Sequence, residues 1–507
     1  MFYFYLLSFL WFLRQTRSFL FWLYLWQLKE YHLGRFLDHF RTEKGKRLFW
    51  NPFFVFKTFL FFYVFSLSFS RELFSPYLYA GWIFILIFIY LLESIKGLKE
   101  FSQKTFRKPV LTSKTLVLIL FVLALEISFL YILFQKFYFV IFQNLYWFSF
   151  YLLSFDILTP FVTTIIVFTI HFLSVIFFRN PLIQKAKKKR ASFQNLLVIG
   201  ITGSFGKTST KEFLSTILSE KFKVLKTKEH QNSEVGISSC VLNDLKEEHE
   251  VFVVEMGAYN KGGIKLLANI VKPKIGIITG INEQHLATFG SMDNLLSAEG
   301  GKELIESLPE NGVVFFNGKN KYCRELYEKA NFKKVLYGEN VVLSGMENIE
   351  GAKTVAKELG MTEGEIEKGA SKIKNQFPGI EIKKNKDGLN IIDASYSANP
   401  DSVIAHLDYL KTFGGKKIIV MPCLIELGKA SKEVHRRIGS KIAEVCDLAI
   451  ITTKDKFKEI KEGAGNKAWL IENPKEIFEK IKGFCQLEDN LLIEGRVPKG
   501  LIDLLGI

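Results

Sequence analysis

One short segment, GITGSFGKTSTKE at residues 200–212, combines residue types that bind phosphate. Common phosphate-binding loops place four residues between the first glycine and the final Gly-Lys-Ser/Thr. Counting back five positions from Gly206 reaches Ile201, so this segment departs from that spacing. Backbone N–H groups and a helix N-terminus would hold the phosphates. We expect Lys207 to meet the β- and γ-phosphates of a nucleotide, and Thr208 to hold Mg²⁺.

The residues around this segment predict elements that would position it. The apolar run Leu196–Ile201 predicts a buried strand, and Lys211–Leu218 has helical character. Strand, glycine-rich loop and helix form the context in which such a loop binds phosphate. The alternative is a plain turn that needs glycine only for its geometry.

Two further side chains follow predicted strands. Val251–Val254 ends at Glu255, and Ile275–Ile278 is followed by a loop that contains His285. Open α/β sheets bind ligands at the carboxyl ends of their strands. We therefore expect Glu255 to bind the metal and consider His285 a second candidate ligand. The alternatives are a surface carboxylate and a structural histidine.

The N-terminal part has a different composition. Most of the 50 phenylalanines precede residue 180, and a bilayer-spanning helix needs about 20 apolar residues. The first 27 residues are apolar but contain Arg14 and Arg17, and could form one span or two half-buried pieces. The other candidate spans are Phe53–Phe69, Leu78–Leu92, Leu116–Gln135 and Ile157–Phe178.

Basic loops predict the orientation of these spans, because cytoplasmic loops carry the Lys/Arg excess. Lys29–Arg47, Lys96–Lys114 and Arg179–Arg190 should all face the cytoplasm. Phe137–Phe155 would then be re-entrant or interfacial, which gives five spans, with six as the alternative. We expect a multi-pass protein of the bacterial cytoplasmic membrane. Glu126 and His171, inside spans, are either helix-packing partners or functional groups.

Charge and cysteine content exclude other classes. The net charge of +16 comes partly from basic residues that flank apolar segments, and no aromatic-basic motif indicates nucleic-acid binding. The five cysteines form no CxxC pair, so neither a zinc site nor a redox motif is indicated.

Five motifs occur in order: ITGSFGKTSTKE, VVEMGA, INEQHLATFGS, DASYSANPDS and ELGKASKEVHRRIG. Together they resemble the Mur ligase family over Asn195–Ile507, and the loop spacing is that family's own. The resemblance implies a P-loop-type central ATPase domain with a mostly parallel sheet (190–377) and a Rossmann-like C-terminal α/β domain (378–507). An α-helical membrane domain (1–180) would precede them.

The resemblance also implies an activity. Family members use ATP to convert a carboxylate into an acyl phosphate, which an amine then attacks, and the motifs favour the branch that adds D-Ala-D-Ala to a muramyl tripeptide. The implied cofactors are ATP and Mg²⁺. The implied catalytic residues are Lys207, Glu255 and His285, and the implied nucleotide contacts are Gly203, Ser204, Phe205, Gly206, Lys207, Thr208, Ser209, Tyr396 and Asn399.

Some positions depart from the family pattern. A lysine that is usually carbamylated aligns with Gly301, and Glu299 could supply the missing negative charge, which would make Thr208, Glu255, His285 and Glu299 the metal ligands. Ile380 and Ala394 also differ, so an inactive, membrane-tethered nucleotide-binding regulator is an alternative. An ATP-driven transporter is disfavoured, because no ABC-type signature follows the loop.

The N-terminus is the largest departure. Family members begin with a domain that holds the UDP-sugar, whereas this chain has apolar segments there. The chain therefore acts either on soluble UDP-muramyl-tripeptide or, as a Mur-like ligase or amidating enzyme, on a lipid-linked muropeptide.

Overall fold

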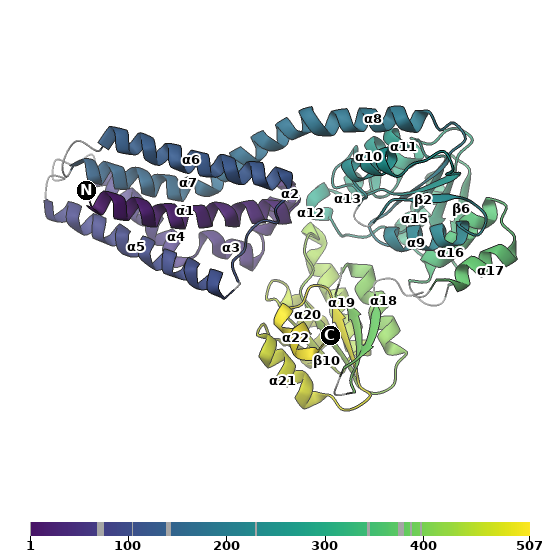
Figure 1. Ribbon diagram of the computed structural model, residues 1–507. Helices are drawn as coiled ribbons and strands as arrows, with labels where there is room; N and C mark the ends of the chain where they lie inside the picture. The colour runs from purple at the N-terminus through teal and green to yellow at the C-terminus, as the bar shows by residue number, and fades with distance from the viewer. Residues whose placement is uncertain are drawn as a thin grey trace. The chain divides into compact units, whose positions relative to one another are not determined.

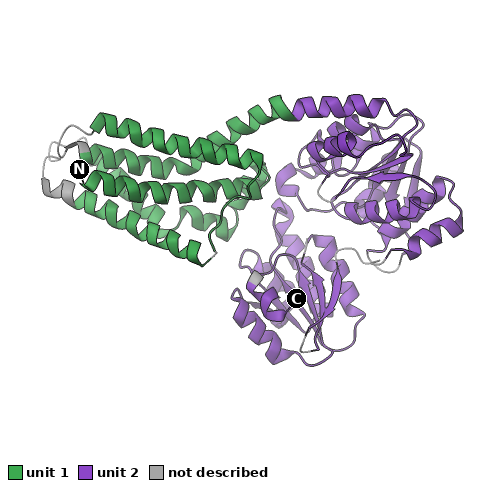
Figure 2. Ribbon diagram, viewed as in Figure 1, with its two compact units in different colours: residues 1–178 green, residues 179–507 purple. Residues whose placement is uncertain are grey.

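The computed structural model describes residues 2–67, 76–103, 105–137, 143–228, 231–341, 345–373, 380–385, 388–395 and 398–506. The chain separates into two compact units, residues 1–178 and 179–507 (Figure 2). Each unit has its own hydrophobic clusters.

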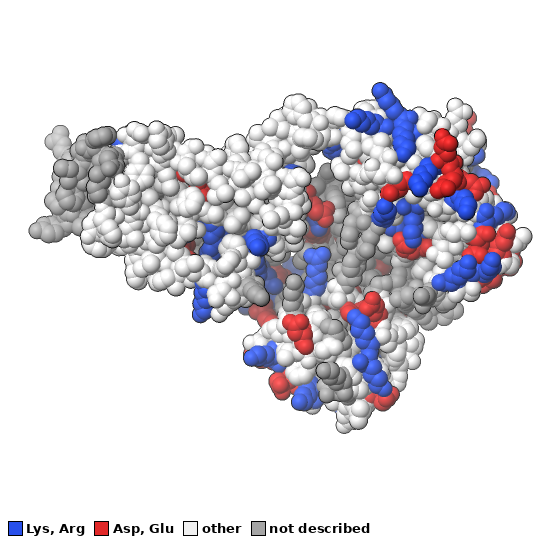
Figure 3. Space-filling model, viewed as in Figure 1, with Lys and Arg blue, Asp and Glu red and all other residues white. Residues whose placement is uncertain are grey.

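Unit 1 is a bundle of helices (Figure 1). They are α1 (Phe2–Leu28), α2 (Leu33–His39), α3 (Glu43–Phe49), α4 (Pro52–Leu67), α5 (Pro76–Ser102), α6 (Ser113–Phe137) and α7 (Gln143–Ser174), followed by a π-helical turn, η2 (Val175–Arg179). Among the described residues, four helical stretches are long and apolar enough to cross a membrane: Glu43–Ser66, Gly81–Ser102, Ser113–Phe137 and Leu145–Ala191. On the face drawn in Figure 3, most of the surface of unit 1 is uncharged.

Two expectations about this unit are resolved by its helices. Residues 2–28 form one continuous helix, α1, rather than two pieces, and α1 is not among the four candidate spans. The separate re-entrant segment at Phe137–Phe155 is wrong for its described residues. From Gln143 onward the chain is one helix that continues through Pro160 to Ser174, because the sequence on both sides of Phe155 is mostly apolar.

A buried charge network lies inside unit 1. Arg14 of α1 and Lys57 of α4 both contact Glu93 of α5 and Asp156 of α7, and the Lys57 Nζ lies 2.8 Å from an oxygen of each carboxylate. All four side chains are at most 12% exposed. Two cations and two anions therefore balance inside the bundle, as buried charges require.

The two polar residues noted in the predicted spans also have partners. The Thr16 hydroxyl donates to Glu126 Oε2 at 2.8 Å, and Lys114 Nζ lies 2.9 Å from His171 Nδ1. Each pair joins two helices, which favours the helix-packing interpretation.

Unit 2 begins with α8 (Asn180–Ala191) and a six-stranded sheet. The strands are β1 (Leu197–Thr202), β2 (Val224–Lys226), β3 (Val251–Glu255), β4 (Ile275–Ile278), β5 (Val313–Asn317) and β6 (Lys334–Tyr337), paired in the order β2-β3-β1-β4-β5-β6. All five pairings are parallel. The helices are α9 (Lys207–Leu218), α10 (Glu234–Asn243), α11 (Gly263–Val271), α12 (Leu286–Phe289), α13 (Met292–Ser297), α14 (Lys302–Ile305), α15 (Lys321–Lys329), α16 (Glu347–Glu358) and α17 (Glu363–Ser371).

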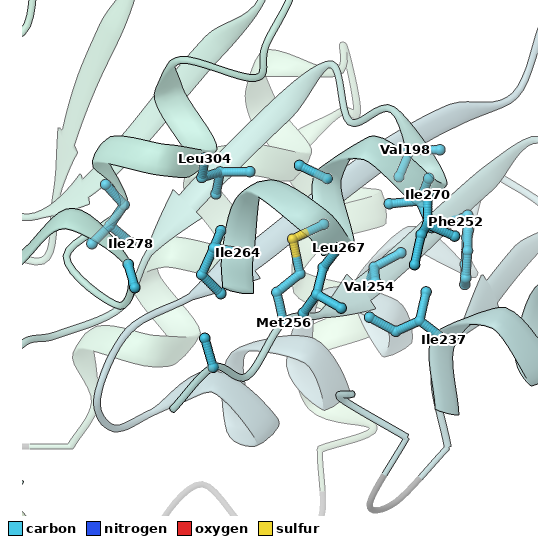
Figure 4. Packing of buried hydrophobic residues seen from close by; sticks show 14 of the residues in the cluster. Val198, Ile237, Phe252, Val254, Met256, Ile264, Leu267, Ile270, Ile278 and Leu304 are labelled. Atoms are coloured by element: carbon cyan, nitrogen blue, oxygen red, sulfur yellow. The ribbon is translucent and has the colours of Figure 1, made fainter. Parts of the chain in front are cut away.

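Successive side chains of β3 point to opposite faces of the sheet. Phe252, Val254 and Met256 pack on one side of the sheet, against α10 and α11 (Figure 4). Val251 and Val253 pack on the other side, against α9. Since side chains alternate along a strand, Glu255 faces α9 and the glycine-rich loop.

Helix α8 packs with α10 and α11 on one face of the first sheet. Ile183 and Ala186 are buried in the same cluster as α10 and α11. The Arg190 guanidinium donates to the carbonyls of Phe193, Leu196 and Val271, so the helix is held at its C-terminal end.

A second six-stranded sheet follows. Its strands are β7 (Glu381–Lys384), β8 (Asn390–Ala394), β9 (Lys417–Met421), β10 (Leu448–Ile451), β11 (Ala468–Leu470) and β12 (Asn490–Glu494), paired in the order β11-β10-β9-β12-β8-β7. Among the described strands of this sheet, only β7 is antiparallel to its neighbour. The helices are α18 (Pro400–Lys411), η3 (Gly428–Ala430), α19 (Ser431–Val445), α20 (Phe457–Ala464), η4 (Gly465–Lys467), α21 (Pro474–Phe484) and α22 (Lys499–Leu505). The predicted fold class, a helical region followed by mostly parallel α/β domains, is confirmed.

Candidate active site

The glycine-rich loop joins β1 directly to α9. Gly203 and Gly206 have φ values of +144° and +81°, a region that favours glycine. A Cβ at Gly203 would lie 2.3 Å from Thr279 Oγ1, and one at Gly206 would lie 2.6 Å from Asn348 Oδ1. Both glycines are therefore needed for a tight loop. Helix α9 begins at Lys207, four residues earlier than the sequence indicated, so Lys207, Thr208 and Ser209 form its first turn.

Lys207 folds back over the loop. Its Nζ donates to the Gly203 carbonyl at 2.5 Å and to the Ser204 carbonyl at 3.2 Å. The Phe205 ring lies against Gly280 at the end of β4, where a Cβ would lie 2.3 Å from a ring carbon. The Lys207 ammonium group and the N-terminus of α9 thus lie at the same loop, which is the chemistry that binds phosphate.

Glu255 and Thr208 are brought together. The Thr208 hydroxyl donates to Glu255 Oε1 at 3.1 Å, and the Asn232 amide donates to the same oxygen at 3.2 Å. The Nζ of the fully buried Lys211 lies 3.3 Å from Glu255 Oε2. Glu255 is thus held next to the loop by three partners, as its position at the end of β3 predicts.

His285 and Glu299 form a second pair. Nδ1 of His285 lies 3.2 Å from Glu299 Oε1, and the imidazole and the Tyr259 ring are nearly perpendicular, with centroids 5.5 Å apart. Burial raises the pKa of the Glu299 carboxyl, but His285 and the Lys207 ammonium outweigh burial and hold that pKa below its ordinary value. Glu299 therefore carries negative charge beside the loop.

The metal ligands expected from the sequence divide into these two pairs. No group of three or more His, Cys, Asp or Glu side chains is placed to hold one ion within the part of the chain that the structure describes. Glu299 Oε2 is nevertheless buried without a hydrogen-bond partner, and Thr208 is exposed next to Glu255. Oxygen donors of this kind suit Mg²⁺, which retains water ligands and needs few protein ligands.

The two nucleotide contacts expected from the second sheet's domain have different outcomes. Tyr396 lies outside the described residues. Asn399 is the N-cap of α18, and its Oδ1 accepts from the backbone N–H groups of Asp401 and Ser402. The same oxygen accepts from the Asn282 amide at 3.0 Å, so Asn399 joins the loop after β4 to the second sheet.

Sequence reasoning missed several residues of this site. Lys211 follows Lys207 by four positions, which places both on one face of α9, and this spacing could have indicated it. Asn282 stands three residues before His285 in the same motif. Asn232 had no local signal, because its contact with Glu255 depends on how α10 begins.

Two domain families match the chain in succession. Residues 201–385 match the Mur ligase middle domain, and residues 380–497 match the Mur ligase glutamate ligase domain. The chain is 30% identical over 335 residues to UDP-N-acetylmuramoyl-tripeptide–D-alanyl-D-alanine ligase of Synechocystis sp., covering 60% of this chain and 72% of that protein. It is also 30% identical to the Bacillus subtilis enzyme of the same name, over 48% of this chain and 60% of that protein.

Solved structures agree with this fold. MurF from Acinetobacter baumannii superposes with a TM-score of 0.58 at 25% identity, over 65% of this chain and 79% of that one. MurF from Thermotoga maritima, solved in complex with ADP, superposes with a TM-score of 0.55 at 24% identity, over 65% and 84%. The fold and site define an ATP-dependent ligase that forms amide bonds. The chain belongs to the Mur ligase family.

Proposed function

We propose that the chain joins D-Ala-D-Ala to a muramyl tripeptide during peptidoglycan precursor synthesis, at the expense of ATP. The supporting observation is that the glycine-rich loop meets both pairs: Thr208 donates to Glu255, and Lys207 acts on the Glu299 carboxylate that contacts His285. The relatives named above carry this activity in their names, although the chain spans only 60% of the Bacillus protein.

Each residue has a proposed part in the reaction. The substrate carboxylate attacks the γ-phosphorus and ADP leaves, and the amine of D-Ala-D-Ala then attacks the acyl carbon and displaces phosphate. The loop amides and Lys207 hold the triphosphate in line, because positioning and charge neutralisation carry phosphoryl transfer. Thr208 with Glu255, and His285 with Glu299, would hold Mg²⁺, which would neutralise phosphate charge when bound. The hydrogen bond from Asn282 to Asn399 would hold the second sheet's domain against the loop after β4 during the reaction.

The test uses the full chain purified in detergent. ATP and D-Ala-D-Ala are supplied with either UDP-muramyl-tripeptide or its lipid-linked form, and the release of ADP and phosphate is measured. We expect release that requires both D-Ala-D-Ala and the soluble acceptor. Release only with the lipid-linked form would assign that acceptor instead, whereas nucleotide binding without release would indicate the inactive regulator.

We also propose that unit 1 anchors the ligase in the cytoplasmic membrane, with unit 2 in the cytoplasm. The four apolar helices and the basic segments Lys29–Arg47 and Arg179–Arg190 support this. Membranes washed with alkaline carbonate should retain the protein, and protease added to spheroplasts should leave unit 2 intact. Release by carbonate would contradict the anchor.

A further inference from the structure

The loop after β9 brings Glu426 against the segment that carries His285. Glu426 is 6% exposed and has a φ of +66°, a left-handed conformation that residues with a side chain rarely adopt. Such a conformation persists only where the surroundings hold it. The contacts of Glu426 should therefore explain why it keeps this backbone conformation.

The first contact is made by the backbone. The Ala287 N–H, in the first turn of α12, donates to the Glu426 carbonyl at 3.0 Å. The first N–H groups of a helix have no partner within the helix, so this carbonyl satisfies one of them. A Cβ at Gly428 would lie 3.1 Å from the same nitrogen, which shows how closely the two loops approach.

The second contact is made by the side chain. Glu426 Oε2 lies 4.0 Å from His285 Nε2, on the opposite side of the imidazole from Glu299. His285 itself has a φ of +67° and is the N-cap of α12. The ring therefore lies between the Glu299 carboxylate of the first sheet's domain, at hydrogen-bond distance, and the Glu426 carboxylate of the second sheet's domain, 4.0 Å away.

Other contacts join the same two domains but do not meet this ring. Asn399 contacts Asn282, and Arg437 lies 3.3 Å from Glu283. These two contacts join the domains without touching His285, whereas the Glu426 carboxylate faces its imidazole.

We propose that Glu426 is a positioning residue of the ligase, which orients His285 when the second sheet's domain docks on the first. The expected loss of kcat rests on the proposed function. The expected change in the environment of the His285 imidazole rests on the geometry alone. Docking of the second domain and completion of the site would thus be one event.

The kinetic test compares Glu426→Gln and Glu426→Gly in the full chain, purified in detergent, with UDP-muramyl-tripeptide, D-Ala-D-Ala and ATP. Glycine accepts the positive φ without strain, so it removes the carboxylate while keeping the loop. We expect kcat to fall about 10- to 100-fold in both variants, because a small misplacement of a reacting group has an effect of this size. The KM for ATP should stay within about twofold.

Glu488 provides a matched control. It also has a positive φ, +72°, but its side chain is 75% exposed and pairs with Lys384. Glu488→Gln and Glu488→Gly should leave kcat unchanged. A wild-type kcat in both Glu426 variants, or a loss only in Glu426→Gln, would overturn the proposal.

A second readout does not need turnover. In protein labelled with ¹⁵N-histidine, the ring signals of His285 are identified by their loss in His285→Asn. Glu426→Gln should shift the Nε2 signal, and Glu488→Gln should not. An unshifted signal would overturn the proposal even if kcat falls. If the wild-type chain shows no ligation, the proposed function fails, but this readout still tests the inference.

Discussion

Lys207 is the residue of the glycine-rich loop that we expect to neutralise phosphate charge. Its ammonium group donates to the carbonyls of Gly203 and Ser204, so it already lies at the loop. A preorganised charge costs little reorganisation at the moment of reaction.

We expect Lys207→Ala to lower turnover about 100-fold or more, since one preorganised charge near the transition state is worth this much. ADP release at saturating substrate measures the effect. Lys265→Ala, at an exposed position of α11, is the control and should keep wild-type turnover. Equal rates for Lys207→Ala and wild type would contradict the role given to this side chain.

Glu299 is the residue that we propose in place of the usual carbamylated lysine. Its depressed pKa keeps it ionised beside His285 and Lys207. Glu299→Gln removes that charge at nearly constant volume, so the Mg²⁺ concentration at half-maximal turnover should rise about tenfold. Titration of turnover with MgCl₂ checks this, with the exposed Glu306→Gln as control. Unchanged magnesium dependence would reject the substitution hypothesis.

Two helices begin with the same Asn-Pro pair, so the effects of their N-caps can be compared. Asn399-Pro400 begins α18 and Asn473-Pro474 begins α21, and both asparagines accept backbone N–H groups. Only Asn399 also contacts Asn282 of the first sheet's domain.

Replacing either asparagine by alanine should lower the free energy of unfolding by about 1 kcal/mol, the usual value of an N-cap. Urea unfolding followed by circular dichroism measures this. Only Asn399→Ala should also lower turnover, because it loses the interdomain contact as well as the cap. Equal turnover in the two variants would show that the Asn282–Asn399 contact does not affect catalysis.

The helices of unit 1 depend on a charge network that connects four of them. Lys57→Met would leave Glu93 and Asp156 with Arg14 alone, and an uncompensated buried charge costs about 3–5 kcal/mol. The midpoint of thermal unfolding in detergent should fall clearly. Lys46→Met, which breaks an exposed pair with Glu43, should change it little. Similar midpoints for the two variants would mean that the network does not stabilise the bundle.

At the scale of the whole molecule, unit 2 has its own cores and should fold without unit 1. A chain of residues 179–507 keeps α8, whereas 192–507 loses the buried Ile183 and Ala186 and the contacts of Arg190. We expect the shorter chain to be less stable by about 2–4 kcal/mol, from the apolar area that it exposes. Urea unfolding of both chains measures the difference, and equal midpoints would show that α8 is not part of the fold.

The sequence determined those features that depend on neighbouring residues. Glycines at two fixed positions before Lys207 indicate the phosphate loop, and apolar runs ending in Glu255 or before His285 indicate strand ends. The apolar length of α4 to α6 likewise predicts membrane-spanning helices. These signals are local, because loop geometry, strand alternation and helix length are properties of short segments.

Only the tertiary structure decided which distant side chains meet. Lys57 and Asp156 are 99 positions apart, and Asn282 and Asn399 are 117 apart. The single helix through residues 143–155 and the division of the expected metal ligands into two pairs also required the folded chain. The neighbouring residues in the sequence do not show whether a charged or polar side chain is solvated or buried. The packing of strands and helices therefore determines which partner such a side chain contacts.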